Sequence, residues 1–374
     1  MPTNDAITAR LPAQASLPPR NPILDALRTL AIVLMVMSHL TRLVARRSWL
    51  LWNELSMLVE PLTQALFLFL VGASVVYSYR SAIAGGRGGW WRSRMLRRAA
   101  GLWLLGLGIY LAETGWQWPH TLTNPGVLST IGIGLALSAV LASRPALACA
   151  ISLGAVGLFV GLEWGGVHVA PLNAASSPWF PDLLELACGA AFAVLLLDGS
   201  SSWKRALALV AVLGFGLALL WRPYEDWFSE GWGRVYTSFR LPGAANGVDQ
   251  MLAWVSGEEL PLRGYRYFNP SAVAFPFLVL HIVALYVLMR PLWRVLDGRV
   301  GRAVLSIGRR ALGAYVLHIV LLGVPTVLMG HRARMDTGEA ALALAALLAA
   351  CYTWALGREA WSRRRRRAAD PAGL

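Results

Sequence analysis

The chain has few charged residues and almost no lysine. Of its 374 residues only 14% are charged and 56% are hydrophobic, whereas about 25% of an average soluble domain is charged. Lysine occurs once, as Lys204, so arginine supplies nearly all the positive charge behind the formal net charge of +14. This balance excludes an ordinary soluble domain. The composition predicts an integral membrane protein.

Cysteine is scarce, and the motifs of soluble enzymes are missing. The three cysteines (Cys149, Cys188 and Cys351) each lie within an apolar segment, and no pair has the spacing of a metal site. We interpret them as small buried side chains. The chain has no HExxH zinc motif, no glycine-rich phosphate loop and no nucleophile elbow. We therefore expect no metal, and no soluble-type hydrolase or nucleotide site.

Apolar runs of spanning length recur along the whole chain. A helix needs about 20 residues to cross a bilayer. The candidates are 23–44, 57–79, 96–112, 127–143, 146–162, 182–197, 205–221, 270–289, 304–325 and 340–357. We therefore expect an all-α, polytopic protein of about ten transmembrane helices. It would comprise a disordered N-terminal segment (1–21), a transmembrane domain (22–357) with a long outer loop (222–268), and a basic tail (358–374).

The basic residues cluster at the ends of the apolar runs. The segment from Arg80 to Arg98 and the tail Arg363–Arg367 are rich in arginine, whereas the stretch from Glu113 to Asn124 has no basic residue. Because basic loops stay in the cytoplasm, both termini are predicted to be cytoplasmic and the protein to lie in the inner (plasma) membrane. This placement, along with contact to anionic lipids, explains the charge more simply than nucleic-acid binding does.

The first apolar run carries three ionisable residues between Leu24 and Leu40. Arg28 and His39 are eleven positions apart, which returns to nearly the same helix face about 16 Å further along, and Asp25 lies near that face. One interpretation is structural: Asp25 and Arg28 form a local ion pair and His39 lies at the membrane interface. The other is functional, because ionisable groups inside a span are costly and commonly mark a site.

The sequence around these residues resembles a known family. The pattern from Leu24 to Ile32, with an arginine and a histidine separated by ten residues, resembles the opening helix of the membrane-bound acyltransferase type 3 family. Thr29 stands where that family usually has glycine. The stretch Leu66–Ser74 is similar to its second helix, and Arg92–Arg98 to the basic cluster before its third.

Segments near the C-terminus are more similar to a related group. Phe268–Ser271 and Ile307–His318 look like the heparan-alpha-glucosaminide N-acetyltransferase group. That group normally carries a histidine before its second helix, and this chain has none between Ser48 and Thr63. That catalytic position is therefore not carried over.

The resemblance implies an acyltransferase that uses acyl-CoA, acetyl-CoA in the first instance. It implies that His39 is the general base or acyl-transfer residue and that Arg28, with Arg92, Arg94, Arg97 and Arg98, serves the acyl-CoA. His281 and His318 are either satisfied by neighbouring carbonyls or line the same cavity as helpers, with His318 the stronger candidate and a predicted catalytic residue. Glu60 and Glu113 are possible partners that orient His39.

The predicted reaction moves an acyl group from cytoplasmic acyl-CoA to a sugar, glycan or lipid-linked sugar across the membrane, and so modifies an envelope polysaccharide. Two alternatives remain open. In the first, Arg28 and the span histidines line the path of a transporter or flippase for a lipid-linked or anionic solute, without acyl chemistry. In the second, the protein is a scaffold for an envelope assembly. Transfer from acyl-CoA would separate the enzyme from both alternatives.

Overall fold

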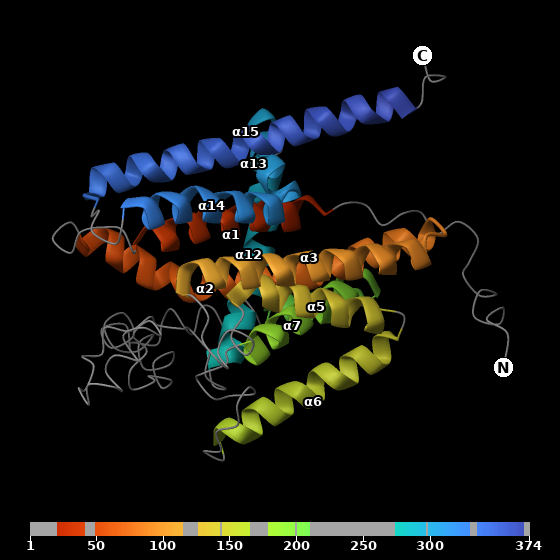
Figure 1. The fold of residues 1–374 in the computed structure, drawn as a ribbon. Coiled ribbons are helices and arrows are strands. Elements are labelled where there is room, and N and C mark those ends of the chain that lie inside the picture. Colours follow the sequence, from red (N-terminus) through yellow and green to blue (C-terminus); the bar gives the residue numbers. More distant parts are fainter. Residues whose placement is uncertain are drawn as a thin grey trace.

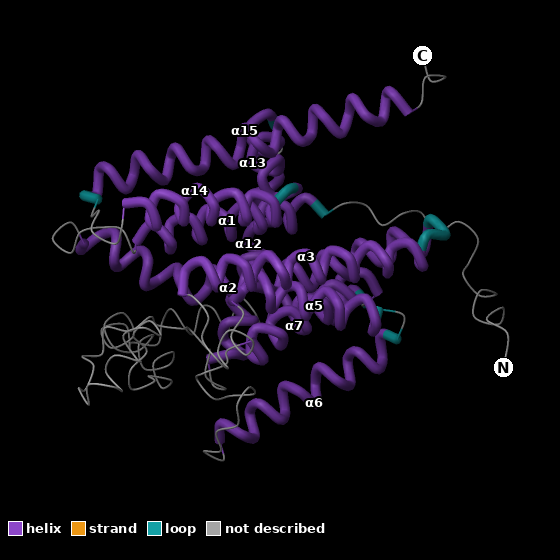
Figure 2. Tube along the Cα trace, viewed as in Figure 1, coloured by secondary structure: helices purple, strands orange, loops and turns teal. Residues whose placement is uncertain are grey.

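The described part of the chain is built from α-helices. A computed structural model describes residues 21–41, 49–114, 126–142, 144–164, 179–198, 200–209, 274–296, 298–329 and 335–369. These residues form helices joined by short turns (Figure 2). In chain order the labelled helices are α1 (Pro22–Thr41), α2 (Trp49–Ala84), α3 (Gly88–Thr114), α5 (Gly126–Leu141), α6 (Pro145–Trp164), α7 (Trp179–Asp198), α12 (Ala274–Leu296), α13 (Arg299–Arg309), α14 (Ala311–Met329) and α15 (Thr337–Ala369). A further helical stretch covers 201–209. The prediction of an all-α protein is confirmed for these residues.

Several of these helices suit a bilayer. Among the described residues, three segments are long and apolar enough to cross a membrane: Pro22–Leu40, Leu62–Ala84 and Thr337–Ser362. Shorter apolar helices run over Val127–Leu141, Leu183–Leu197, Val279–Trp293 and Ala311–Gly323. The chain is therefore a membrane protein. The expected number of about ten transmembrane helices stays a prediction. Most of the expected span at 205–221, the loop at 222–268 and the segment 1–20 lie outside the described residues.

The start of α1 is fixed by its own sequence. The backbone N–H of Ile23 donates to Asn21 Oδ1 at 3.1 Å, so Asn21 caps the helix. Pro22 follows at the first helical position, where it loses no hydrogen bond, and Asp25 in the first turn complements the helix dipole. The Asn21 amide also donates to the Tyr286 hydroxyl of α12 at 2.9 Å. The cap therefore starts α1 and ties it to a helix far along the chain.

The helix α1 lies at the centre of the bundle. It packs against α2, α12, α13, α14 and α15, and Figure 1 shows it between α14 and α2. Leu27, Ala31, Ile32, Val36 and Leu40 are almost fully buried. Because these positions fall on several faces of α1, partners surround the helix rather than covering one side. A polar side chain on α1 therefore meets other helices within the bundle.

Glycines allow α2 and α7 to approach closely. A Cβ at Gly72 would collide with the backbone carbonyl of Leu186, and a Cβ at Gly189 with that of Phe69. Small residues at helix crossings are the usual means by which membrane helices bring their backbones together. This crossing holds α2 in place, and α2 in turn packs against α1.

We expect Gly189→Ala to destabilise the protein. The added methyl group must push α7 away from the Phe69 carbonyl, and such overpacking costs about 1–3 kcal/mol. The matched control is Gly154→Ala on α6, where an added Cβ has no neighbour within 4 Å. Thermal unfolding in detergent should show a lower midpoint for Gly189→Ala and an unchanged or slightly raised one for Gly154→Ala. Equal midpoints for the two variants would contradict the close crossing.

One predicted span is divided in two. The run 304–325 was expected to form a single helix, but the chain bends at Arg310, which has φ −121° and ψ 21° and separates α13 from α14. The Arg310 side chain donates to Ser362 Oγ at 3.1 Å, and Arg309 pairs with Glu359 at 3.4 Å. The prediction of one continuous helix was wrong, because α13 carries several arginines and packs across the end of α1 instead of continuing α14.

The last helix runs without a break into the basic tail. It begins with a reciprocal cap, in which the Glu339 N–H donates to Asp336 Oδ1 at 2.8 Å and the Asp336 N–H to Glu339 Oε2 at 2.9 Å. Figure 1 shows α15 along the upper edge of the bundle, extending past α13 and α14 toward its C-terminal end. The expected boundary at residue 357 therefore coincides with no change of secondary structure.

Candidate functional site

The structure brings together two histidines that are 279 positions apart in the sequence. His39 lies in the last turn of α1 and His318 on α14. His39 Nδ1 is 2.9 Å from His318 Nε2, which is a hydrogen-bonding distance. The two ring planes differ by 22° and the ring centroids are 5.1 Å apart. The two histidines that the sequence singled out for catalysis therefore form one pair.

Aromatic side chains support this pair from the α14 side. The edge of Tyr315 packs against His318, with centroids 5.3 Å apart and an interplanar angle of 69°. Phe67 of α2 stacks on Tyr315 at 5.2 Å. His318, Tyr315 and Phe67 are buried, whereas His39 is half-buried. His318 is thus held in a packed aromatic environment, and His39 is the more accessible member of the pair.

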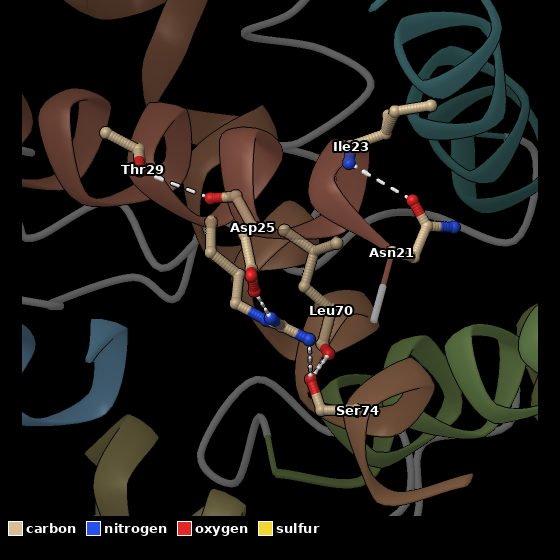
Figure 3. Close-up of polar contacts among 7 residues, drawn as sticks. Asn21, Ile23, Asp25, Thr29, Leu70 and Ser74 are labelled. Atoms are coloured by element: carbon tan, nitrogen blue, oxygen red, sulfur yellow. Dashed lines mark hydrogen bonds and ion pairs between the residues drawn. The ribbon is translucent and has the colours of Figure 1, made fainter. Parts of the chain in front are cut away.

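Arg28 lies near the opposite end of α1 and is held by two partners. Its Nη1 donates to the Asp25 carboxylate, and its Nη2 donates to Ser74 Oγ of α2 at 2.6 Å. The Ser74 hydroxyl donates its own proton to the Leu70 carbonyl, so it accepts from Arg28 (Figure 3). Asp25 is buried and the Arg28 side chain is 18% exposed. We call Asp25, Arg28 and Ser74 the arginine clasp.

The helix α13 closes over the arginine clasp. A Cβ at Gly308 would collide with the Asp25 carbonyl oxygen, so only glycine allows α13 to lie this close to α1. The Thr29 hydroxyl donates to the same Asp25 oxygen at 3.2 Å. Thr29, which departs from the pattern of the acyltransferase type 3 family, is therefore buried and satisfied in place.

The four arginines of α3 are not brought to the arginine clasp. Trp91, Met95, Ala99 and Leu102 form the buried face of α3. Arg92, Arg94, Arg97 and Arg98 fall between these positions and are exposed. Arg94 lies over the Trp90 ring at 4.9 Å, and Arg97 Nε donates to the Ser93 carbonyl. The exposed arginines form a basic surface on α3, separate from the buried clasp.

These contacts bear on both interpretations of the first helix. The local ion pair between Asp25 and Arg28 is present, as the structural interpretation expected. The two ends of the helix face that Arg28 and His39 share contact different neighbours, since Arg28 bonds to α2 and His39 to α14. The arginine clasp and the histidine pair are therefore two polar groups along α1, linked by apolar packing.

The structure describes the other predicted site residues less completely. His281 lies half-buried on α12. Glu60 and Glu113 fall on α2 and α3, but their side chains lie outside what the structure describes. Sequence reasoning missed Ser74, Tyr315 and Phe67 as contacts of the site. The sequence signal that could have identified Ser74 was a single hydroxyl within an apolar run. No sequence signal pointed to Tyr315 or Phe67.

Comparison with known proteins supports the acyltransferase interpretation. Residues 20–172 match the family model of the heparan-alpha-glucosaminide N-acetyltransferase catalytic region. The match includes Arg28, His39, Ser74 and the four arginines of α3, and it ends well before His318. No curated protein matches the chain. Over residues 20–172, less than half of its length, the chain is therefore similar to the heparan-alpha-glucosaminide N-acetyltransferase catalytic region.

Proposed function

We propose that the protein transfers an acyl group, acetyl in the first instance, from cytoplasmic acyl-CoA to a sugar or glycan on the far side of the inner membrane. The observation that carries this proposal is the hydrogen-bonded pair of His39 and His318 inside a bundle of apolar helices. His39 lies in the part of the chain that matches the acetyltransferase family. An imidazole is the side chain best suited to accept a proton at neutral pH.

The chemistry assigned to His39 is general-base catalysis. The acceptor hydroxyl or amine gives its proton to the imidazole as its oxygen or nitrogen attacks the thioester carbonyl. The carbon–sulfur bond then breaks, the acyl group remains on the acceptor, and the leaving thiolate of coenzyme A takes the proton from the His39 imidazolium, which restores the neutral base. A positioned base of this kind contributes about 10²–10⁴ in rate.

The arrangement of helix ends suits a donor and an acceptor on opposite sides. In Figure 1 the start of α1, the turn between α2 and α3, and the basic end of α15 all point toward the same end of the bundle. Placing this arginine-rich end in the cytoplasm follows the positive-inside rule. Arg28 then lies near the cytoplasmic end of α1 and His39 near the outer end, in the last turn. The donor would enter from the arginine side and the acceptor would meet His39.

The basic surface of α3 supports donor binding. Coenzyme A carries several phosphate charges, and a guanidinium can bind a phosphate through two parallel hydrogen bonds. Arg92, Arg94, Arg97 and Arg98 are exposed near the start of α3, next to the turn at Gly86. In this proposal they bind the anionic part of acyl-CoA at the cytoplasmic surface, while Arg28 lies deeper, within the bundle.

We expect replacement of these four arginines by glutamine to raise the KM for acyl-CoA. Because each lost phosphate contact weakens donor binding, the expected rise is about tenfold or more, with kcat changed less. The matched control replaces the same four residues by lysine, which keeps the charge and hence the membrane orientation. Lysine should give an intermediate KM because it lacks the two-pronged geometry. A KM unchanged in the glutamine variant would assign the cluster to topology alone.

The transfer reaction itself is tested in membranes that contain the protein. Vesicles are supplied with acetyl-CoA carrying a labelled acetyl group, and the surface polysaccharide is analysed by mass spectrometry with and without the protein. A mass increase of one acetyl group per modified sugar supports the proposal and identifies the acceptor. Movement of solute across the vesicle membrane without consumption of acetyl-CoA would overturn it in favour of a transporter.

A further inference from the structure

The hydrogen bonds around His318 determine which of its nitrogen atoms carries a proton. His318 Nδ1 lies 3.4 Å from the backbone carbonyl oxygen of Ala314, one turn earlier on α14. A carbonyl oxygen can only accept, so the proton in this contact belongs to Nδ1. A neutral imidazole has one N–H donor and one acceptor nitrogen. His318 Nε2 is therefore an acceptor.

This assignment fixes the proton on the neighbouring histidine. His318 Nε2 is 2.9 Å from His39 Nδ1. Because His318 Nε2 accepts, His39 Nδ1 must donate, and in the neutral ring the lone pair of His39 then lies on Nε2. The N–H groups thus donate in one direction along this series of hydrogen bonds, from His39 to His318 and from His318 to the Ala314 carbonyl.

We propose that His318 is a positioning residue, which holds His39 in the tautomer and orientation that make His39 Nε2 the base. This inference rests on the proposed function. It changes the role that the sequence suggested for His318, because a fully buried ring packed against Tyr315 contacts the base rather than the substrate. His39 is half-buried and is the ring that meets the acceptor. The same logic applies to histidine bases whose second nitrogen donates to an acceptor group.

A neutral partner suits this location. In soluble enzymes a carboxylate often accepts the hydrogen bond from the catalytic histidine, but an ionised carboxylate is expensive to bury within a membrane. A neutral imidazole provides an acceptor without a charge. When His39 takes a proton from the acceptor substrate, its Nδ1–H bond to His318 becomes charge-assisted and therefore stronger. His318 thus stabilises the protonated base while remaining neutral itself.

The distinguishing experiment compares His318→Gln with His318→Ala. A glutamine can present its side-chain oxygen to His39 Nδ1, but it cannot take up or release a proton. If His318 positions His39, the glutamine variant keeps acyl transfer within about tenfold of wild type, whereas the alanine variant loses about 10²-fold. His39→Gln serves as the comparison, because an amide at the position of the base should lose activity as fully as alanine does.

A spectroscopic measurement gives a readout that does not depend on turnover. The full-length protein is labelled with ¹⁵N-histidine, and the His39 signals are assigned by their loss in His39→Gln. The wild type and His318→Gln should show His39 protonated at Nδ1, and His318→Ala should show a mixture of tautomers.

The outcomes separate the two proposals. If His318→Gln keeps its fold but is as inactive as His318→Ala, His318 itself transfers the proton and the positioning role is overturned. Detection of the Nε2-protonated tautomer of His39 in the wild type would overturn it as well. If the wild type shows the Nδ1-protonated tautomer but transfers no acetyl group, the arrangement of the pair stands and the proposed function fails.

Discussion

Replacing His39 with alanine is expected to lower the rate of acyl transfer by about 10²–10⁴-fold, the contribution of a positioned general base. His39 is the half-buried member of the histidine pair and lies in the last turn of α1. In the proposed mechanism its removal leaves the acceptor substrate with no group to take its proton. The expected loss falls mainly on kcat, because the imidazole acts on the acceptor proton during the reaction and not on the coenzyme A phosphates.

The control for this variant is a truncation elsewhere on the same helix. Leu34→Ala shortens a half-buried apolar side chain of α1 that lies outside the buried core cluster, and it should keep acyl transfer near the wild-type rate. Both proteins are compared at equal amounts in the membrane, with thermal unfolding as a check of the fold. Acyl transfer by His39→Ala at the wild-type rate would remove His39 from the mechanism.

The spacing within α1 was predictable from the sequence, but the partners of its polar residues were not. Helix periodicity relates Arg28 to His39 because both lie on one helix. Ser74 and His318 are 46 and 279 positions away from the residues they contact. Which helix faces which depends on packing, and one sequence contains no pairing signal for it. His318 was proposed because its flanking residues resembled a known group, not because of any relation to His39.

The division of the run 304–325 shows a second limit of sequence reasoning. An apolar window averages over its residues, so Arg309 and Arg310 were included in a span that continued on either side of them. In the structure these two arginines find partners on α15, in Glu359 and Ser362. Those partners allow α13 to lie across the end of α1. Average hydropathy finds the presence of an apolar segment better than it finds a bend within it.

The contacts of the arginine clasp give Arg28 a structural role, which must be measured separately from any role in binding the donor. The ion pair with Asp25 balances the charge of Arg28, and Ser74 accepts a second hydrogen bond. Such a clasp can hold α1 against α2 whether or not a donor binds. A single replacement of Arg28 would combine two effects, because it leaves the buried Asp25 carboxylate without its counter-charge. The effects separate only when both members of the ion pair are removed together.

Asp25→Ala is therefore expected to destabilise the protein strongly, and the double variant Asp25→Ala/Arg28→Met to recover most of the loss. Removing one partner of a buried ion pair leaves an uncompensated charge and costs about 3–5 kcal/mol, whereas replacing both partners by apolar groups is often close to neutral. The midpoint of thermal unfolding should fall in Asp25→Ala and return in the double variant. A midpoint equally low in both variants would contradict this account of the clasp.

The double variant then tests what Arg28 does beyond holding the fold. If Arg28 contributes to donor binding, the folded double variant should show a raised KM for acyl-CoA with kcat less affected. If Arg28 serves only the packing of α1 on α2, the recovered protein should have the wild-type KM. In that case the exposed arginines of α3 would carry the binding of acyl-CoA alone. The comparison is decisive because the stability measurement shows first that the protein is folded, so a change in KM cannot come from loss of structure.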